Sequence, residues 1–329
     1  MTWFSHGFME NGPRTDFGCV KLSGSEVILV GGKKDYQGLQ DCDFFNLETK
    51  RWSKGPKLPI EMSYCRAVIL DDCVYAIGTY RDFYRLRLHH INLGWQRLPP
   101  VKVDGYGCEI VSDRKRYVYL IGDNTTRSSL HMYDTIQNKW KILPVMESER
   151  DLAKAVHVDG EIYVIGGRAG ETGETAISHL DVFDTTTRQW RVGPDIPKRM
   201  YGHSATLVGK YIFVCGGQRC PGSKAFSSCF VFDIDCQEWI TIEANLPERV
   251  TGHSSISWGM NVLILGGSSG HSNATHHLYM MKIDREVLPE AFGLGTSSNS
   301  GRSSRSRLSG RNRRAGLKSF RALTKRFSK

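Results

Sequence analysis

Histidines are the side chains of this chain best suited to chemistry, and they form two groups. His203 and His253 lie in YGHSA and TGHSS, at the same place in two successive units of the chain. Because a residue that recurs with a repeat belongs to the repeat rather than to one site, we interpret both as structural rather than catalytic. His271, His276 and His277 lie in GHSNATHH, where imidazole nitrogens could bind a metal ion. No carboxylate or thiolate is near them in sequence, so we predict a solvated polar loop instead.

Cysteine is the other reactive residue type, and its pattern argues against a metal site. Cys215 and Cys220 lie in CGGQRC, a spacing that does not match a zinc knuckle, and no second pair exists. Cys215 ends an apolar run, so we expect it to pack as a small hydrophobic residue. The nine cysteines are irregularly spaced, which favours free thiols in a reducing compartment. We therefore predict a cytoplasmic location, with the nucleus as the alternative, and no metal, cofactor or catalytic residue.

Arginine recurs at a nearly fixed distance before a repeated glycine. The distance is 17 residues for Arg14, Arg199 and Arg249, and 16 residues for Arg150. A guanidinium group can hold a carboxylate through two parallel hydrogen bonds, so these residues could bind an acidic peptide segment. The alternative is that they form ion pairs with acidic neighbours of their own chain, such as Glu149, Asp151 and Glu248.

The glycines that define this spacing belong to a sixfold internal repeat. Six apolar runs of strand length end in glycine: VILVGG (27–32), VYAIGT (74–79), VYLIGD (118–123), IYVIGG (162–167), IFVCGG (212–217) and VLILGG (262–267). After each of the first five, a second segment ends in tryptophan: Trp52, Trp95, Trp140, Trp190 and Trp239. Each unit reads as four short strands, and no helical pattern interrupts the series. The pattern predicts an all-β propeller of six blades.

The order of glycine pair, aromatic-Asp segment and tryptophan resembles the kelch repeat over about residues 1–284. The second and third units depart from it with Gly78-Thr79 and Gly122-Asp123, so we expect these two blades to be less regular. The resemblance implies a six-bladed kelch-type propeller. An iron-binding Glu-x-x-x-Asp-x-x-x-His pattern, found in some related propellers, is absent.

Trp3 is the residue that indicates how the ring closes. Each blade tryptophan precedes the first glycine of the next unit by 26 or 27 residues, and Trp3 precedes Gly31 by 28. The sixth unit, in turn, has no tryptophan after its HLYMMKID segment at 277–284. We therefore predict that residues 1–12 supply the last strand of the sixth blade, which removes an open sheet edge.

The kelch resemblance also implies where a partner would bind. In such propellers the loops before the first strand and after the second strand meet at one mouth of the channel, where partner peptides bind. By this resemblance Arg14, Arg150, Arg199 and Arg249 would surround the mouth with Tyr201, and Arg81 and Arg168 would add to the set. We predict a non-catalytic interaction module, which could select substrates for a ubiquitin ligase. No F-box or BTB region is visible ahead of the propeller, and the alternative is an enzyme that acts at the mouth.

Residues 285–329 differ in character from the rest. From residue 291 onward there are eleven Lys or Arg and no acidic residue, while residues 1–290 have a net charge of −1. The Ser/Arg-rich part predicts a disordered tail, and 315–329 reads as a basic amphipathic segment. We predict contacts of this tail with an anionic membrane, a calmodulin-like groove or nucleic acid, or with no partner, through Leu317, Phe320, Arg321, Lys325 and Phe327. A further alternative makes the tail the part that determines location.

Overall fold

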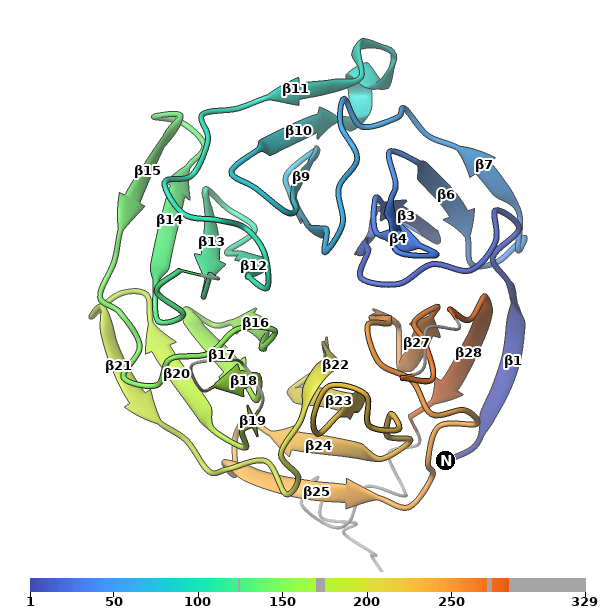
Figure 1. Cartoon of the computed structure of the whole chain (residues 1–329), viewed down its shortest axis with the longest axis vertical. Coiled ribbons are helices and arrows are strands. Elements are labelled where there is room, and N and C mark those ends of the chain that lie inside the picture. The colour runs from blue at the N-terminus through green and yellow to red at the C-terminus, as the bar shows by residue number, and fades with distance from the viewer. Residues whose placement is uncertain (124, 170–174, 271–273, 284–329) are drawn as a thin grey trace, which may run out of the picture. The chain divides into compact units, whose positions relative to one another are not determined.

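A computed structural model describes residues 1–123, 125–169, 175–270 and 274–283. Six four-stranded antiparallel sheets stand around a central channel, as Figure 1 shows, and this confirms the six-bladed propeller. The first strands of the blades, β2, β8, β12, β16, β22 and β26, contact one another in a closed circle. Among the described residues, no helix has the length and apolar character that crossing a bilayer requires.

The blades are numbered along the chain, and within each blade the strands run from the channel outward. Blades 1 to 3 consist of β2 (Gly18–Lys21), β3 (Glu26–Val30), β6 (Cys42–Asn46) and β7 (Trp52–Lys54); of β8 (Arg66–Leu70), β9 (Cys73–Ile77), β10 (Phe83–Arg87) and β11 (Trp95–Arg97); and of β12 (Glu109–Ser112), β13 (Tyr117–Ile121), β14 (Leu130–Asp134) and β15 (Lys139–Ile142). Blades 4 to 6 consist of β16 (Lys154–Val158), β17 (Glu161–Ile165), β20 (Leu180–Asp184) and β21 (Gln189–Val192); of β22 (Tyr201–Val208), β23 (Tyr211–Gln218), β24 (Cys229–Asp233) and β25 (Glu238–Ile242); and of β26 (Ser254–Trp258), β27 (Asn261–Leu265), β28 (His277–Lys282) and β1 (Trp3–Phe8). Smaller elements are the hairpins β4 (Lys33–Lys34) with β5 (Gln37–Gly38) and β18 (Arg168–Ala169) with β19 (Thr175–Ala176), and the 3-10 helix η1 (Leu88–Leu93).

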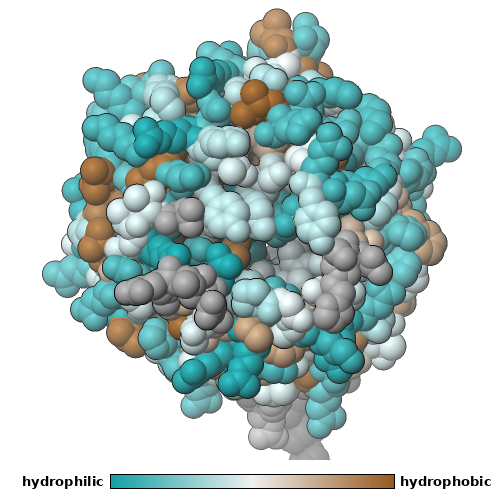
Figure 2. All heavy atoms as spheres, viewed as in Figure 1, coloured by the Kyte–Doolittle hydropathy of each residue, from teal (hydrophilic) through white to brown (hydrophobic). Residues whose placement is uncertain are grey.

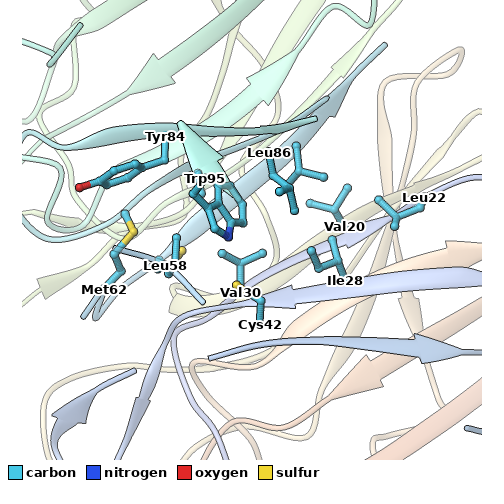
Figure 3. Packing of buried hydrophobic residues seen from close by; sticks show 13 residues of the cluster. Val20, Leu22, Ile28, Val30, Cys42, Leu58, Met62, Tyr84, Leu86 and Trp95 are labelled. Atoms are coloured by element: carbon cyan, nitrogen blue, oxygen red, sulfur yellow. The ribbon is translucent and has the colours of Figure 1, made fainter. Parts of the chain in front are cut away.

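The hydrophobic core lies between neighbouring blades. Each second strand is buried on both faces, as in β3, where every residue after Glu26 is buried. This explains why these strands read as continuous apolar runs instead of alternating patterns. Figure 3 shows one such layer, where Val30 and Cys42 of blade 1 pack with Tyr84 and Trp95 of blade 2.

The glycine pairs tie each blade to the loop that precedes the next blade. Gly166 and Gly167 both have positive φ, 56° and 110°, a conformation that favours glycine. A Cβ at Gly166 would meet the Met200 carbonyl oxygen at 2.7 Å, and the Gly167 N–H donates to that same oxygen at 2.9 Å. In blade 2, Thr79 replaces the second glycine and donates instead to the Ser63 carbonyl at 3.0 Å.

Blades 2 and 3 keep all four strands despite their departures from the repeat. In blade 2, η1 replaces the short turn between the third and fourth strands. In blade 3, the buried Asp123 accepts hydrogen bonds from the N–H groups of Thr125 and Thr126 at 2.6 and 2.7 Å, and from the Ser129 hydroxyl. These local changes leave the sheets intact.

The tryptophans on the outer strands anchor each blade to the one before it, and Trp3 does the same. The indole N–H of Trp190 donates to the Pro144 carbonyl at 2.8 Å, and that of Trp239 to Pro194 at 2.8 Å. Trp3 donates to the Ala244 carbonyl at 3.2 Å, and β1 pairs antiparallel with β28. The predicted closure of the sixth blade by the N-terminal strand is confirmed.

Candidate functional site

The two predicted sets of loops meet at one end of the channel and form a cavity of about 410 Å³. Lys33 and Arg168 come from the short hairpins that follow second strands, while Tyr64, Tyr106 and Tyr201 come from the segments before first strands. Figure 2 shows this face, where side chains of intermediate hydropathy gather around a central hollow. We call this cavity the mouth.

The backbone repeats the same turn around the mouth. The residue two positions before each first strand has a positive φ in all six blades: Asp16, Tyr64, Gly107, Leu152, Gly202 and Gly252. At this residue or the one before it, three blades carry a tyrosine. The turn therefore places Tyr64, Tyr106 and Tyr201 at corresponding points of the circle.

One side of the mouth is built on Lys33. Its ammonium group donates to the Tyr64 hydroxyl at 2.9 Å, lies 2.9 Å from an Asp16 carboxylate oxygen and stands 4.1 Å from the centre of the Tyr64 ring. Tyr64 in turn contacts Tyr106 edge to face, with ring centres 4.5 Å apart. Burial lowers the pKa of Lys33, but Asp16 and Tyr64 raise it further, and the net shift is upward.

The other side is built on Arg168. Its Nε and Nη2 groups donate to both oxygens of Asp151, at 2.8 and 2.7 Å, and its guanidinium lies 5.5 Å from the centre of the Tyr201 ring. The Tyr201 hydroxyl accepts a hydrogen bond from Gln218 at 2.6 Å. The hydrogen bonds to Asp151 raise the pKa of Arg168, and burial raises the pKa of Tyr106 to about 12. Both cations therefore stay charged at neutral pH.

Arg14 and Arg150 do not lie at the mouth, which corrects our prediction for these two residues. Arg14 is 4% exposed and donates to Asp43 at 2.6 Å. Arg150 is fully buried, forms an ion pair with Asp181 and donates to the carbonyls of Gly166 and His179 at 3.2 and 3.0 Å. The alternative of intrachain ion pairs is therefore confirmed for both, with partners other than those expected.

A one-residue difference in loop length explains this placement. The carbonyl of Arg14 accepts from Gly267, as the Met200 carbonyl accepts from Gly167, so Arg14 corresponds to Met200 rather than to Arg199. At this position the side chain points into the blade, where blade 5 packs Met200 with its apolar cluster. Blades 1 and 4 instead place Asp43 and Asp181 at matching points of their third strands, where they compensate the arginine charge.

The remaining predicted residues divide between the cavity and its surroundings. Tyr201 and Arg168 line the mouth, as predicted. Arg81, Arg199 and Arg249 are exposed, and they are not among the described residues that line the cavity. Arg249 donates to the Ala225 carbonyl at 3.3 Å.

Sequence reasoning missed several residues of the mouth. These are Lys33, Tyr36, Tyr64 and Tyr106. Tyr36 is at the tip of the β4–β5 hairpin with φ 67° and is 82% exposed. The available signal was the recurrence of tyrosine two or three residues before the first strands, which the search for arginine overlooked.

Below the mouth, the first strands of blades 2 to 4 place a charged cluster inside the channel. Glu109 lies 3.3 Å from Arg66 and 2.6 Å from Lys154. These three residues, with Ser204 and His253, line an inner cavity of about 240 Å³. The single carboxylate is held by two cations, so it is not placed to act as a general base.

The histidine clusters agree with their structural interpretation. His203 is fully buried, and burial lowers its pKa to about 3, so the ring is neutral. His277 contacts Glu248 at 2.6 Å, while His271 lies outside the described residues. In the part of the chain that the structure describes, no three His, Cys, Asp or Glu side chains are grouped for a metal ion. The predictions for the tail, residues 285–329, also fall outside that part.

Comparisons with known proteins agree with the fold. Residues 10–275 match the family model described as the Attractin/LZTR1 beta-propeller. The chain is 27% identical over 158 residues to human Kelch-like protein 23, which covers 45% of this chain and 27% of that protein. It is 26% identical over 165 residues to Kelch-like protein 40 of Xenopus tropicalis, covering 46% and 27%. An F-box/kelch-repeat protein of Arabidopsis thaliana is 38% identical over 78 residues, covering 22% of each chain. The chain thus spans about a quarter of the length of these relatives. By the match over residues 10–275, it belongs to the Attractin/LZTR1 beta-propeller family and is a kelch-type propeller.

Proposed function

We propose that the mouth binds an extended peptide segment of a partner protein. The observation that carries this proposal is the convergence of four tyrosines with Lys33 and Arg168 on one cavity of about 410 Å³. Tyrosine and arginine are enriched among the residues that contribute most to protein interfaces, because they combine apolar area with hydrogen-bonding groups. The propeller fold and the kelch-like relatives support a protein-interaction module.

The protonation states at the mouth favour binding over catalysis. General acid–base catalysis is most effective when the catalytic pKa lies near the operating pH. Here the pKa of Tyr106 is raised to about 12, and those of Lys33 and Arg168 are also raised. These groups supply fixed charges and hydrogen bonds, as a recognition site requires.

We propose further that the bound segment is acidic. A guanidinium has five N–H donors, and Arg168 directs its Nε and Nη2 groups to Asp151, so its other terminal nitrogen can hold a peptide oxygen. The exposed Arg81, Arg199 and Arg249 add positive charge outside the cavity. Charges at such positions steer an acidic partner toward the site and raise the association rate.

Two exposed tyrosines offer a matched test. Tyr36 and Tyr80 both have positive φ, 67° and 78°, and both are largely exposed, but only Tyr36 is among the described residues that line the mouth. Peptides selected from a displayed library on the whole chain would be measured by fluorescence anisotropy. We expect Tyr36→Ala to weaken their binding about tenfold, which corresponds to ~1.4 kcal/mol. Tyr80→Ala should leave the affinity unchanged. Peptides that respond to Tyr80→Ala and not to Tyr36→Ala, or selected sequences without Asp or Glu, would contradict the proposal.

We propose that such a peptide belongs to a protein that this chain presents to a ubiquitin ligase, since one relative is an F-box/kelch-repeat protein. The test is the half-life of the peptide's parent protein in cells that express the intact chain or Tyr36→Ala. A shorter half-life with the intact chain only would support this role. An equal half-life in both cells would argue against it.

A further inference from the structure

Two cysteines face each other on neighbouring strands of blade 5. Cys215 of β23 is directly opposite Cys229 of β24. The Gly216 N–H donates to the Ser228 carbonyl at 3.1 Å, so the next pair along the strands is hydrogen bonded and Cys215–Cys229 is a non-hydrogen-bonded pair. At such pairs the Cα atoms are about 4.5 Å apart, within the range of roughly 4.4–6.8 Å that a disulfide spans. A cross-strand disulfide can therefore form with little movement of the backbone.

Cys215 also has a polar environment that is unusual for a buried thiol. Its sulfur lies 3.6 Å from the His253 Nε2 atom and 3.4 Å from the Ser204 hydroxyl. Burial raises the pKa of Cys215, but hydrogen bonds from Cys229, His253 and Ser204 lower it more, and the net shift is downward. The pKa of Cys229 is raised by its contact with Cys215 and by burial. The pair thus combines a thiolate, which is the reactive form, with a neighbouring thiol.

Packing alone does not require this arrangement, because the other blades fill the same place differently. The corresponding strand pairs, all within the described residues, are Val30–Cys42, Ile77–Phe83, Ile121–Leu130, Ile165–Leu180 and Leu265–Leu278. Blade 4 gives the nearest comparison, since His203 lies against its Gly166 as His253 lies against Gly216 in blade 5. There an isoleucine and a leucine take the places of the two cysteines.

A path for a small oxidant leads to this pair from the channel. Ser204 and His253, which contact the Cys215 sulfur, line the inner cavity of about 240 Å³. Cys215 and Cys229 are themselves fully buried. The cavity can admit a molecule of the size of water or hydrogen peroxide, while a bulky thiol reagent has no direct contact with either sulfur.

We propose that Cys215 and Cys229 are a redox-active pair that a hydroperoxide oxidises to a disulfide, with Cys215 as the nucleophile held as thiolate by His253. The Cys215 thiolate attacks one peroxide oxygen and the O–O bond breaks, which forms a sulfenic acid on Cys215 and releases hydroxide. The Cys229 sulfur then attacks the Cys215 sulfur, the S–O bond breaks, and the hydroxyl leaves as water with the Cys229 proton. In total, two thiols lose two electrons, and one peroxide is reduced to two water molecules. This site is separate from the peptide-binding function proposed for the mouth.

The test uses the whole reduced chain treated with hydrogen peroxide, followed by alkylation of the remaining thiols, tryptic digestion and mass spectrometry. We expect a disulfide that links residues 211–219 to residues 225–249. A Cys236→Ser background assigns the bond, because Cys236 lies in the second peptide. The link should be absent in Cys215→Ser and in Cys229→Ser, and should form normally in Cys42→Ser, which changes the cysteine at the corresponding place of blade 1.

The contribution of His253 is tested with His253→Phe, because Phe17 occupies the corresponding position before the first strand of blade 1. We expect the disulfide to form at least tenfold more slowly in this variant, with a far-ultraviolet circular dichroism spectrum like that of the wild type. The absence of the link in wild-type protein, under conditions that oxidise the exposed Cys220 and Cys236, would overturn the proposal. An unchanged rate in His253→Phe would also overturn it.

Discussion

The buried ion pair between Arg150 and Asp181 gives the sharpest test of how the blades are built. Replacing Arg150 with methionine leaves the Asp181 carboxylate buried, at 4% exposure, without its cation. It also removes the hydrogen bonds that Arg150 donates to the carbonyls of Gly166 and His179 and to the Ser148 hydroxyl. Breaking one partner out of a buried pair costs about 3–5 kcal/mol, so Arg150→Met should lower the free energy of unfolding by that amount.

The same reasoning predicts a rescue, because blade 5 has an apolar solution at this place. There Met200 occupies the arginine position and Phe230 the aspartate position, and both are buried. The double variant Arg150→Met with Asp181→Phe should recover most of the lost stability, since no unpaired charge is left. Urea unfolding followed by tryptophan fluorescence measures both changes. A single variant that loses less than about 1 kcal/mol, the range of an exposed pair, would refute the reasoning. So would a double variant as unstable as the single one.

Three further predictions concern other parts of the chain. His203 has a folded pKa of about 3 against an ordinary value of 6.5, so the unfolded state binds more protons between these values. Its contribution to stability is therefore present above pH 6.5 and is lost as the pH falls toward 3, by up to ~1.4 kcal/mol per pH unit; urea unfolding from pH 7 to 5 should show a smaller slope in His203→Ala, and an equal slope would contradict the shifted pKa. Trp3→Phe removes the hydrogen bond to the Ala244 carbonyl and should lower the free energy of unfolding by about 1 kcal/mol, whereas an unchanged unfolding midpoint would argue against the anchoring role of the indole. Deletion of residues 291–329 removes eleven cations and changes the net charge from +10 to −1. We expect it to abolish cosedimentation with vesicles that contain phosphatidylserine, and equal binding of both forms would count against the predicted membrane contact of the tail.

The architecture of this propeller could be predicted because its determinants are local and repeated. Each second strand is a short apolar run that ends in a glycine, and a positive φ at that glycine is a property of its own backbone. Each outer strand begins near a tryptophan, and the constant distance from this residue to the next glycine revealed the role of Trp3. Six copies of one pattern make every element visible six times, so even the closing strand was predicted correctly.

The site depended on contacts that no local pattern contains. A difference of one residue in loop length places Arg14 and Arg150 inside the blades, and the aspartates that compensate them lie about thirty residues further along the chain. The mouth is assembled from loops of different blades, so Lys33, Tyr64 and Tyr106 become neighbours only when the ring closes. The sequence by itself therefore determined the repeat and its closure, because these follow from short-range spacing. Only the tertiary structure decided which side chains face the mouth, because burial and charge pairing join residues that are distant in the chain.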